Sequence, residues 1–479
     1  MTILDQYGQP MTASVSPRLR AAAKRRAQIR DRVTAAYDAA QTTPENAKHW
    51  RWADSLSAAQ ANSADIRSTI RDRARYEVAN NSFASGIVDT LANDIVGTGP
   101  RLQIQTNDDA VNRQVETAWN AWAQAVNLPG KLRTAIRARI VDGEAFLQRG
   151  DRQRGTTPVT LNIHGIECDQ MDDPQDSASD PTHVAGVYLE NGEPVGYDKL
   201  NYHPGDHHGY TMTASRIDAD DVIHIYRQDR PGQLRGISQL TPSLPLGAIL
   251  RRYTLATLLA AEIFADHTLF LESGASEFDD EDADEVDAFD AVDIDRGMIT
   301  AMPKGWKVNG IDPKQPVATY KEFRDAILNE FARCVHMPRG RALADFSGYN
   351  YASGRLDELS YWSAIDIEHA DIERLVLERI FGWWFDESIL IPGYLPSLPA
   401  YHHGLPKRWY WAGRKHADPA KEAAAAKILQ SIGYLTDDEY LFANGTDPES
   451  HHQQRTRDAR RRREIADIET PAPKQGAAT

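Results

Sequence analysis

Apolar residues recur at a spacing of four between Asn81 and Gly97, a pattern that predicts one helix face. The apolar members are Phe83, Ile87, Val88, Leu91 and Ile95. Asn81 or Ser82 can cap the start, because a short side-chain oxygen accepts a bond from a free backbone N–H. Gly97 suits a left-handed stop, and the alternation over 102–105 predicts a strand after it.

The same stretch ends in "GTG", which raises the possibility of a nucleotide-binding loop. That loop requires a strand, then G-x-G-x-x-G, then a helix. Here the helix comes first and the third glycine is absent. The pattern therefore favours a corner between a helix and a strand.

Helical and strand patterns alternate along the rest of the chain. Helical spacing is predicted for an Ala-rich region up to about Gln60, around Trp119–Asn127, over 132–140, from Pro245, over 319–335, over 353–384 and from Asp418. Strands are predicted beyond "DGE" at 142–144, over 158–225 with a hairpin at "ENGEP", in "DDVIHIYR", and as a hairpin over 297–310. "RGRALADFSGYNYASG" is predicted to be a loop, "TDDE" a capping box, and the chain after about Ile468 disordered.

Two long helices have distinct apolar patterns. In the helix from Pro245, apolar residues cover most of the circumference, so we expect burial on several sides, in a bundle or a subunit interface. The second helix places Phe323, Ile327, Leu328 and Phe331 on one face.

The charge is unevenly distributed in a chain of 479 residues with a net charge of −15. Residues 277–295 contain eleven acids and no Lys or Arg, whereas residues 18–32 and 455–463 are rich in arginine. Such basic blocks can meet nucleic acid or acidic partners, or form solvated helix faces. The two cysteines are too few for a disulfide framework, and neither a signal core nor a membrane span is apparent, so we expect a soluble protein made in a reducing cytosol.

Catalytic signatures are sparse. No P-loop, G-x-S-x-G or H-E-x-x-H motif occurs. Histidine pairs at 207–208, 402–403 and 451–452, with His203 nearby in sequence, are weak candidates for a metal site. Asp142 and Glu144 would share a face in a strand, which permits a weak paired-carboxylate hypothesis. The sequence therefore favours an assembly component over an enzyme.

Five motifs, in order, resemble the lambda-like branch of the phage portal proteins. They are "RARYEVANNSFASGIVDTLANDIVGTGPRLQ", "RARIVDGEAF", "DDVIHIYRQDRPGQLRGIS", "FRDAILNEFARCVHMPRGRALADFSGYNYASGR" and "DPAKEAAAAKILQSIGYLT". The resemblance covers roughly 71–447. It departs from the family at 352–355, where this chain has Ala-Ser-Gly-Arg instead of Ser-Ser-Ala-Arg, and in the length of the acidic segment.

The resemblance implies an α+β portal fold with a mixed wing domain, long stem helices, an α/β clip and a helical C-terminal crown. The implied parts are 1–235, N-terminal region and wing; 236–270, first stem helix; 271–315, clip; 316–336, second stem helix; 337–352, tunnel loop; 353–415, long helix and wing return; 416–467, crown; and 468–479, disordered tail.

The resemblance also implies a role without catalysis or cofactor. Portals form a ring, typically of twelve copies, at one capsid vertex, and double-stranded DNA passes through it during packaging and ejection. The implied partners are other copies of the chain, the large terminase subunit, capsid and scaffold proteins and a head–tail connector, with assembly in the host cytoplasm and residence in the virion.

Three groups of residues are the candidate contacts. Arg339 and Arg341 in the tunnel loop would touch DNA phosphates. Lys304, Trp306 and Lys307 would lie on the clip surface. The acidic segment, with Asp279, Asp280, Glu281, Asp282, Asp284 and Glu285, would line the lumen or face terminase. The alternatives are a metal-dependent enzyme and a nucleic-acid-binding protein that forms no ring.

Overall fold

The computed structural model describes residues 44, 47–173, 180, 182–206, 213–266, 270–273, 306–309, 320–396, 405–414 and 418–469. The chain divides into two units, Met1–Ser57 and Ala58–Thr479. In the first unit, residues 47–52 form turns and a bend rather than the expected helix, and most of the Ala-rich region lies outside the described residues. There, the Asp54 carboxylate accepts a hydrogen bond from the Leu56 backbone N–H at 3.0 Å, a local bond that competes with a helix.

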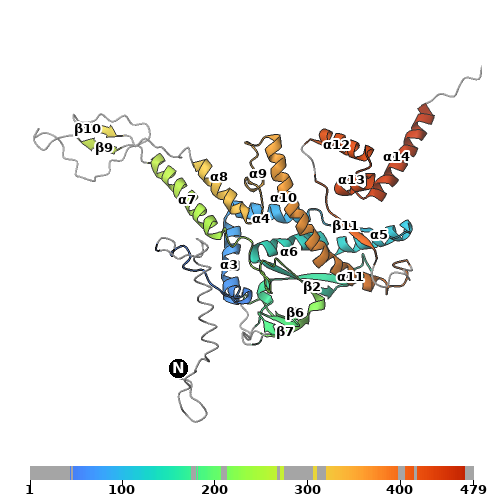
Figure 1. Ribbon diagram of the computed structural model, residues 1–479, viewed down its shortest axis with the longest axis horizontal. Helices are drawn as coiled ribbons and strands as arrows, with labels where there is room; N and C mark the ends of the chain where they lie inside the picture. The colour runs from blue at the N-terminus through green and yellow to red at the C-terminus, as the bar shows by residue number, and fades with distance from the viewer. Residues whose placement is uncertain are drawn as a thin grey trace, which may run out of the picture. The chain divides into compact units, whose positions relative to one another are not determined.

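Helices and small antiparallel sheets make up the described part of the second unit (Figure 1), which agrees with the predicted α+β class. The helices are α2 (Ala58–Ala61), α3 (Ala64–Asn80), α4 (Ser82–Val96), α5 (Asp109–Ala125), α6 (Leu128–Asp142), α7 (Leu244–Asp266), α8 (Tyr320–Arg333), α9 (Arg339–Leu343), α10 (Tyr351–Ile372), α11 (Glu378–Ser388), α12 (Pro419–Ser431), α13 (Asp437–Ala443) and α14 (Pro448–Glu469). The strands are β1 (Arg101–Ile104), β2 (Glu144–Asp151), β3 (Leu161–Ile166), β4 (His183–Val184), β5 (Val187–Glu190), β6 (Glu193–Leu200), β7 (Ala214–Asp218), β8 (Val222–Tyr226), β9 (Phe270–Ser273), β10 (Trp306–Asn309) and β11 (Lys407–Tyr410).

The predicted corner between a helix and a strand is confirmed. Asn81 caps α4, and its side-chain oxygen accepts a hydrogen bond from the Phe83 backbone N–H at 3.0 Å. Gly97 ends the helix with φ at 54° and donates to the Asn93 carbonyl at 2.7 Å. After the corner, β1 pairs antiparallel with β11, a strand that the sequence did not predict.

An aromatic cluster fills the core beside α5. Trp119 is 1 % exposed, and its ring lies within about 6 Å of four other aromatic rings, from α5, α11 and β11. They are Trp122, Phe381, Trp384 and Trp409. Burial of such large apolar rings is the main stabilising contribution in this part of the fold.

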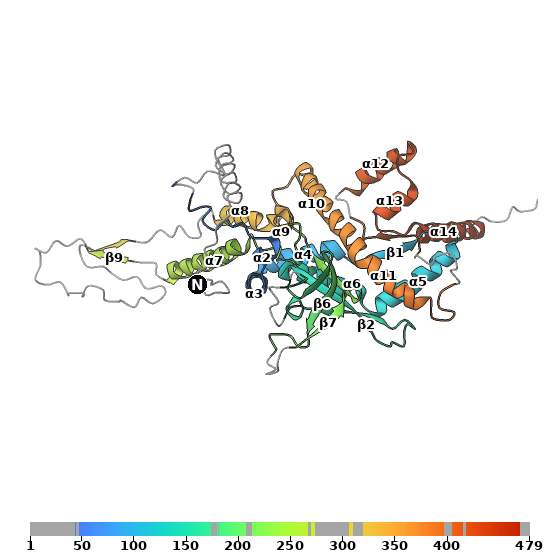
Figure 2. The ribbon, with the colours of Figure 1, turned by 60° about the horizontal axis from the view of Figure 1, so that its bottom comes forward.

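Two antiparallel sheets form the strand-rich middle of the chain (Figure 2), as expected for 158–225. In the first, β2 lies between β3 and β8; in the second the order is β4-β5-β6-β7. The predicted hairpin is confirmed, since β5 and β6 pair across Asn191 and Gly192, which have φ of 54° and 89°. Positive φ at both turn residues matches the right-handed twist of the two strands.

Helices α7 and α8 pack against each other in opposite directions. The Tyr320 hydroxyl, at the start of α8, donates to Thr254 in the middle of α7 at 3.2 Å, while Ser243, just before α7, donates to the Phe331 carbonyl near the end of α8 at 3.0 Å. Gly247 permits this approach, because a Cβ there would lie 2.8 Å from the Phe331 ring.

The chain beyond α7 and before α8 contributes one described strand pair. The strand within the hairpin predicted over 297–310 is confirmed at β10, but β10 pairs with β9, on the other side of the acidic segment. Residues 297–305 lie outside the described residues.

The predicted loop between α8 and α10 is partly helical, which corrects the prediction. It contains α9, which is one turn and a half long, too short for a periodic apolar signal in sequence. The long helix predicted over 353–384 is confirmed, starting at Tyr351 and ending at Ser388 with a wider turn at Glu373–Leu377. Asn350 caps it by accepting from the Ser353 backbone N–H at 2.8 Å.

The C-terminal helices are capped as predicted. Asp418 caps α12, and Thr436 and Glu439 form the capping box of α13. Both cysteines are free, as expected from their number. Among the described residues, no helix has the length and apolar character required to cross a membrane.

Candidate functional site

The candidate tunnel loop folds back on its own short helix. The Gly340 backbone N–H donates to the Tyr349 hydroxyl at 2.9 Å, and the rings of Phe346 and Tyr349 lie 6.0 Å apart. A cavity of about 480 Å³ lies beside this turn and is lined by residues of α9, the turn and α10, among them Phe346, Leu359 and Trp362. The segment is therefore held by internal contacts in the single chain.

Arg341 is held on both sides by carboxylates. Its guanidinium donates to both oxygens of Glu358 at 2.8 Å and to Asp94 at 2.7 Å, and it lies 5.0 and 5.1 Å from the rings of Tyr361 and Trp362. Burial alone lowers the pKa of Arg341, but Glu358 and Asp94 outweigh it, so the pKa is raised. Arg341 thus joins α9 to α4 and α10, an internal position that the sequence did not predict.

Arg339 is more available to a partner. Its side chain is 46 % exposed and, among the described residues, makes one ion pair, with Asp325 at 3.1 Å. Asp325 is also paired with Arg324 at 2.8 Å, so it keeps a cation even if Arg339 turns away. Residues two apart on a helix point to different sides, which explains why these neighbouring arginines have different environments.

Glu144, one of the two weak catalytic candidates, is the centre of a buried charge network, which we call the Glu144 network. Its carboxylate is fully buried and accepts from Arg235 at 2.6 to 3.1 Å, from the Gly236 backbone N–H at 2.9 Å and from His224 at 3.0 Å. Arg71 lies 3.7 Å away. These groups tie β2 and β8 to α3 and to the segment that leads into α7.

The protonation states of this network follow from its surroundings. Burial alone raises the pKa of Glu144, but Arg235 and His224 outweigh it and hold the pKa well below its ordinary value. Burial lowers the pKa of His224, so the imidazole is neutral and its Nε2–H is the donor to Glu144. A carboxylate that is held ionised by a permanent cation is a poor proton acceptor, so the network is structural.

Asp142, the other catalytic candidate, does not share a strand face with Glu144. It ends α6, whereas Glu144 begins β2 after Gly143, whose φ of 97° turns the chain. Asp142 accepts two hydrogen bonds from Arg75, at 2.7 and 3.0 Å. The paired-carboxylate hypothesis is therefore wrong, because the glycine turn separates the two side chains.

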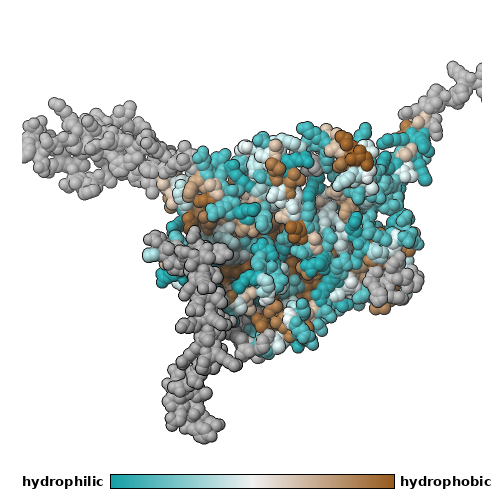
Figure 3. Space-filling model, in the orientation of Figure 1, coloured by the Kyte–Doolittle hydropathy of each residue, from teal (hydrophilic) through white to brown (hydrophobic). Residues whose placement is uncertain are grey.

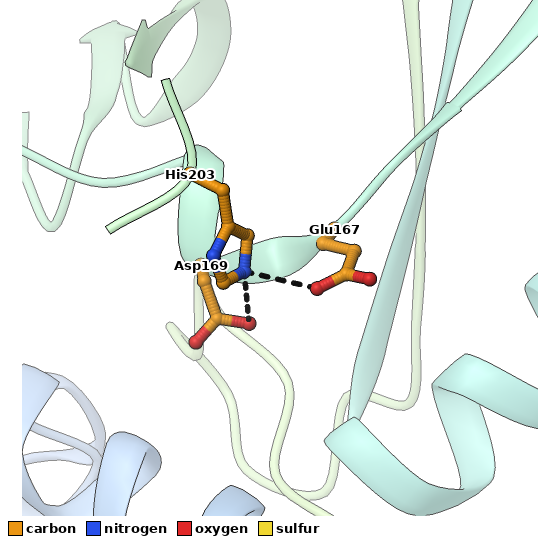
Figure 4. A group of neighbouring side chains, drawn as sticks. All are labelled: Glu167, Asp169 and His203. Carbon is orange, nitrogen blue, oxygen red and sulfur yellow. Dashed lines mark ion pairs between the residues drawn. The ribbon is translucent and has the colours of Figure 1, made fainter. Parts of the chain in front are cut away.

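Glu167, Asp169 and His203 lie close enough together to hold a metal ion (Figure 4). His203 Nε2 is 3.0 Å from Glu167 and 3.7 Å from Asp169. However, the two oxygens of Asp169 accept from Arg71 and Arg75, each at 2.7 Å, and these cations hold the pKa of Asp169 below its ordinary value although burial alone raises it. An ion at this place would have to displace the Arg75 guanidinium, so the cluster is better described as an ion-pair network.

A second cluster of metal-ligating residue types consists of His183 in β4, Asp198 in β6 and Asp173, which comes before this sheet in sequence. His183 Nε2 is 2.7 Å from Asp198, which also accepts from the Tyr188 hydroxyl at 3.0 Å. The His183 ring stacks on Tyr188 at 4.1 Å. The imidazole is thus engaged by a carboxylate and an aromatic ring within the sheet.

The remaining sequence candidates have mixed placements. His207, His208, His402, His403, Lys304 and the acidic residues Asp279, Asp280, Glu281, Asp282, Asp284 and Glu285 lie outside the described residues. Trp306 and Lys307 are in β10. His452 lies 2.9 Å from Asp438 and joins α14 to α13, a structural contact for a pair that was only a weak metal-site candidate.

Several large apolar side chains of the described residues remain exposed to solvent. In α7 these are Ile249, Leu255, Leu258 and Leu259, each more than half exposed; we call this set, which extends over more than one side of the helix, the α7 apolar face. Phe323 of α8 is 50 % exposed, with its ring 5.3 Å from Tyr253 of α7. Brown hydrophobic patches interrupt the hydrophilic face drawn in Figure 3. The burial predicted for this helix on several sides is therefore not provided by the described residues of its own chain.

Among the comparisons with known proteins, the family model agrees with the motif resemblance. Among curated proteins, none matches the chain. Solved chains that align with it include one from "Virion of native gene transfer agent (GTA) particle" (TM-score 0.43, 14 % identity, covering 79 % of this chain and 93 % of that one) and one from "Neck of native GTA particle computed with C12 symmetry" (TM-score 0.42, 14 % identity, 78 % and 92 %). The family model described as "Phage portal protein, lambda family" matches residues 45–368, about two thirds of the sequence, and the chain therefore belongs to that family.

Proposed function

We propose that the chain, as a portal protein, forms a homo-oligomeric ring, expected to be a dodecamer, at one capsid vertex. Double-stranded DNA passes through its channel during packaging and ejection. The observation that carries this proposal is the family match over residues 45–368.

The α7 apolar face supports ring formation. Leu258 is 62 % exposed and Ile249 is 57 % exposed, and they lie on different sides of α7. A subunit in a ring has two different contact surfaces, one for each neighbour, so exposure on more than one side suits a ring. Contact with neighbouring copies would remove these side chains from water, at about 25 cal/mol per Å² of apolar surface.

The parts of the subunit are proposed from the family. Helices α7 and α8 form the stem, with the clip at 271–315 between them. The regions 1–235 and 353–415 form the wing, and α12 to α14 form the crown. The clip, with Lys304, Trp306, Lys307 and the acidic segment, is the proposed docking surface for terminase and later for the head–tail connector. Capsid and scaffold proteins surround the ring.

The channel contacts are revised by the geometry. Arg339 is the proposed phosphate contact, because it is half exposed and weakly held. Arg341 is proposed as a positioning residue, because its donors are directed at Glu358 and Asp94. The chain is proposed to act by guiding DNA, while a separate terminase supplies the work of packaging.

The test is the size and shape of the purified protein, measured by light scattering and negative-stain electron microscopy. Rings with a central hole at about a dozen subunit masses are expected. Leu258→Glu should reduce the ring fraction, whereas Leu390→Glu, a control at a 78 % exposed site outside α7, should not. A chain that stays monomeric with its scaffold present would contradict the proposal.

A further inference from the structure

We propose that the second half of α14 is a DNA-binding element, separate from the channel loop, that takes the phosphate backbone of duplex DNA. Between 455 and 463 it carries six arginines and one acid. The six are Arg455, Arg457, Arg460, Arg461, Arg462 and Arg463, which we call the arginine segment. The inference deepens the proposed function and rests on it for the choice of duplex DNA as the polyanion.

The arginine segment is exposed and strongly basic, with Asp458 inside it and Glu464 directly after it as the nearest acids in sequence. All six side chains belong to exposed residues, and within the described part of the chain none of them makes an ion pair. By contrast, the first half of α14 is held to the body. Glu449 pairs with Arg113 at 3.3 Å and His452 pairs with Asp438 at 2.9 Å. The result is an anchored helix whose far half is free to meet a partner (Figures 1 and 2).

Like charges crowd this half of the helix. Arg457 and Arg461 are four residues apart and Arg460 and Arg463 three apart, so both pairs are neighbours that repel each other on the helix surface. A polyanion would remove this repulsion. The arginine segment, 455–463, contains no large apolar residue, so it lacks the apolar anchor that a protein interface requires.

The distribution of the arginines suits a groove lined by phosphates. At about 100° per residue the six positions surround the helix instead of forming one face. A helix of about 10–12 Å diameter enters the major groove of B-DNA, which is about 12 Å wide, and there both walls carry phosphates. Every cation in the segment is arginine, whose planar fork donates two parallel bonds to a phosphate.

The experiment measures binding of the full chain to a labelled 30-base-pair duplex by fluorescence anisotropy, over about 50 to 200 mM salt. The test variant changes Arg460, Arg461, Arg462 and Arg463 to Gln. The charge-keeping control changes the same four residues to Lys, and an Arg339→Gln variant reports on the channel loop. If four phosphate contacts are lost, the slope of log Kd against log salt falls by about 3 to 4, and affinity at the low-salt end falls at least about tenfold. The Lys control should keep most of the binding and the slope.

Two outcomes overturn the inference. One is binding by the Gln variant equal to wild type at every salt concentration. The other is displacement of the duplex by poly-glutamate as effectively as by unlabelled duplex at equal charge, which would assign the segment to an acidic protein partner. Ring formation by each variant is checked by negative-stain microscopy. If the Gln variant forms rings normally and binds DNA as the wild type does, only this inference is rejected. If the wild-type protein never forms rings, the proposed portal ring is rejected, and the DNA-binding comparison can still be interpreted.

Discussion

Replacing Glu144 with Gln is expected to destabilise the fold strongly while leaving its shape almost unchanged. The substitution keeps the volume of the side chain but removes its charge. The Glu144 carboxylate is fully buried, and Arg235, which is 3 % exposed, directs two nitrogens at it. In the variant, an amide NH₂ group would face the guanidinium, which then lacks its counter-charge in a fully buried site.

The magnitude follows from this burial. Removing one partner of a buried ion pair costs about 3–5 kcal/mol, because the other charge remains desolvated. The Gly236 N–H and the His224 Nε2–H share the same carboxylate, so they also lose part of their acceptor. Domain stability is typically about 5–15 kcal/mol, so the loss is a large fraction of the total.

The assay is guanidinium unfolding followed by tryptophan fluorescence at fixed protein concentration, with the free energy of unfolding as the readout. The matched control is Asp89→Asn, which removes the charge from a pair with Arg137 whose side chains are 52 % and 46 % exposed, at 2.9 Å. An exposed pair contributes about 0–1 kcal/mol, so the control should be nearly neutral. If Glu144→Gln lost no more than the control, the ionised state assigned to Glu144 would be refuted.

Three further predictions follow from the same structure. Arg341→Ala should lower the free energy of unfolding by about 2–3 kcal/mol, because it removes charged hydrogen bonds to Glu358 and Asp94. Arg339→Ala should change the free energy of unfolding by less than about 1 kcal/mol. Equal losses would contradict the roles given to the two arginines. Gly143→Ala should give little folded protein, since φ is 97° and the added Cβ would lie 2.4 Å from the Ile237 backbone. The control Gly86→Ala, at a helical position with nothing within 4 Å of the added Cβ, should stabilise the fold by up to about 1 kcal/mol. Soluble yield and thermal unfolding compare the two variants, and a well-folded G143A chain would refute the close approach. Burial lowers the pKa of His224 and His369 below the ordinary value of 6.5, so below that pH the unfolded chain binds protons that the folded chain does not bind. The stabilising contribution of the neutral imidazoles is therefore fully present above about pH 6.5 and falls as the pH drops below it, by at most about 1.4 kcal/mol per pH unit for each group. Unfolding curves at pH 7.5 and 5.5 that coincide would be inconsistent with neutral buried imidazoles.

The local sequence predicted a helix or strand well where it contains the start, the apolar face and the end of that element. The helix from Ser82 to Val96 has an apolar face, a capping Asn81 and a stop at Gly97, and all three are found in the structure. The capping box at Thr436 and the hairpin turn at Asn191 are similar cases. In contrast, β11 and α9 are only four and five residues long, and their positions depend on partners distant in sequence.

The candidate site shows the same division between local pattern and long-range contact. Arg339 and Arg341 look alike in sequence, yet Asp94, 247 positions away, and Glu358 determine that one of them is internal. The pairing of Glu144 with Arg235 spans 91 positions and could not be predicted from the local sequence either. The apolar pattern of α7 gave a different kind of information, since it predicted burial that the described residues of its own chain do not supply for the α7 apolar face. Apolar side chains left in water forgo a burial free energy of about 25 cal/mol per Å² of surface. A helix that is predicted to be buried but is observed to be exposed therefore indicates a binding partner. The mismatch between pattern and structure at α7 is therefore evidence for a partner at this helix that does not depend on the family match, and a neighbouring copy in the proposed ring would supply it.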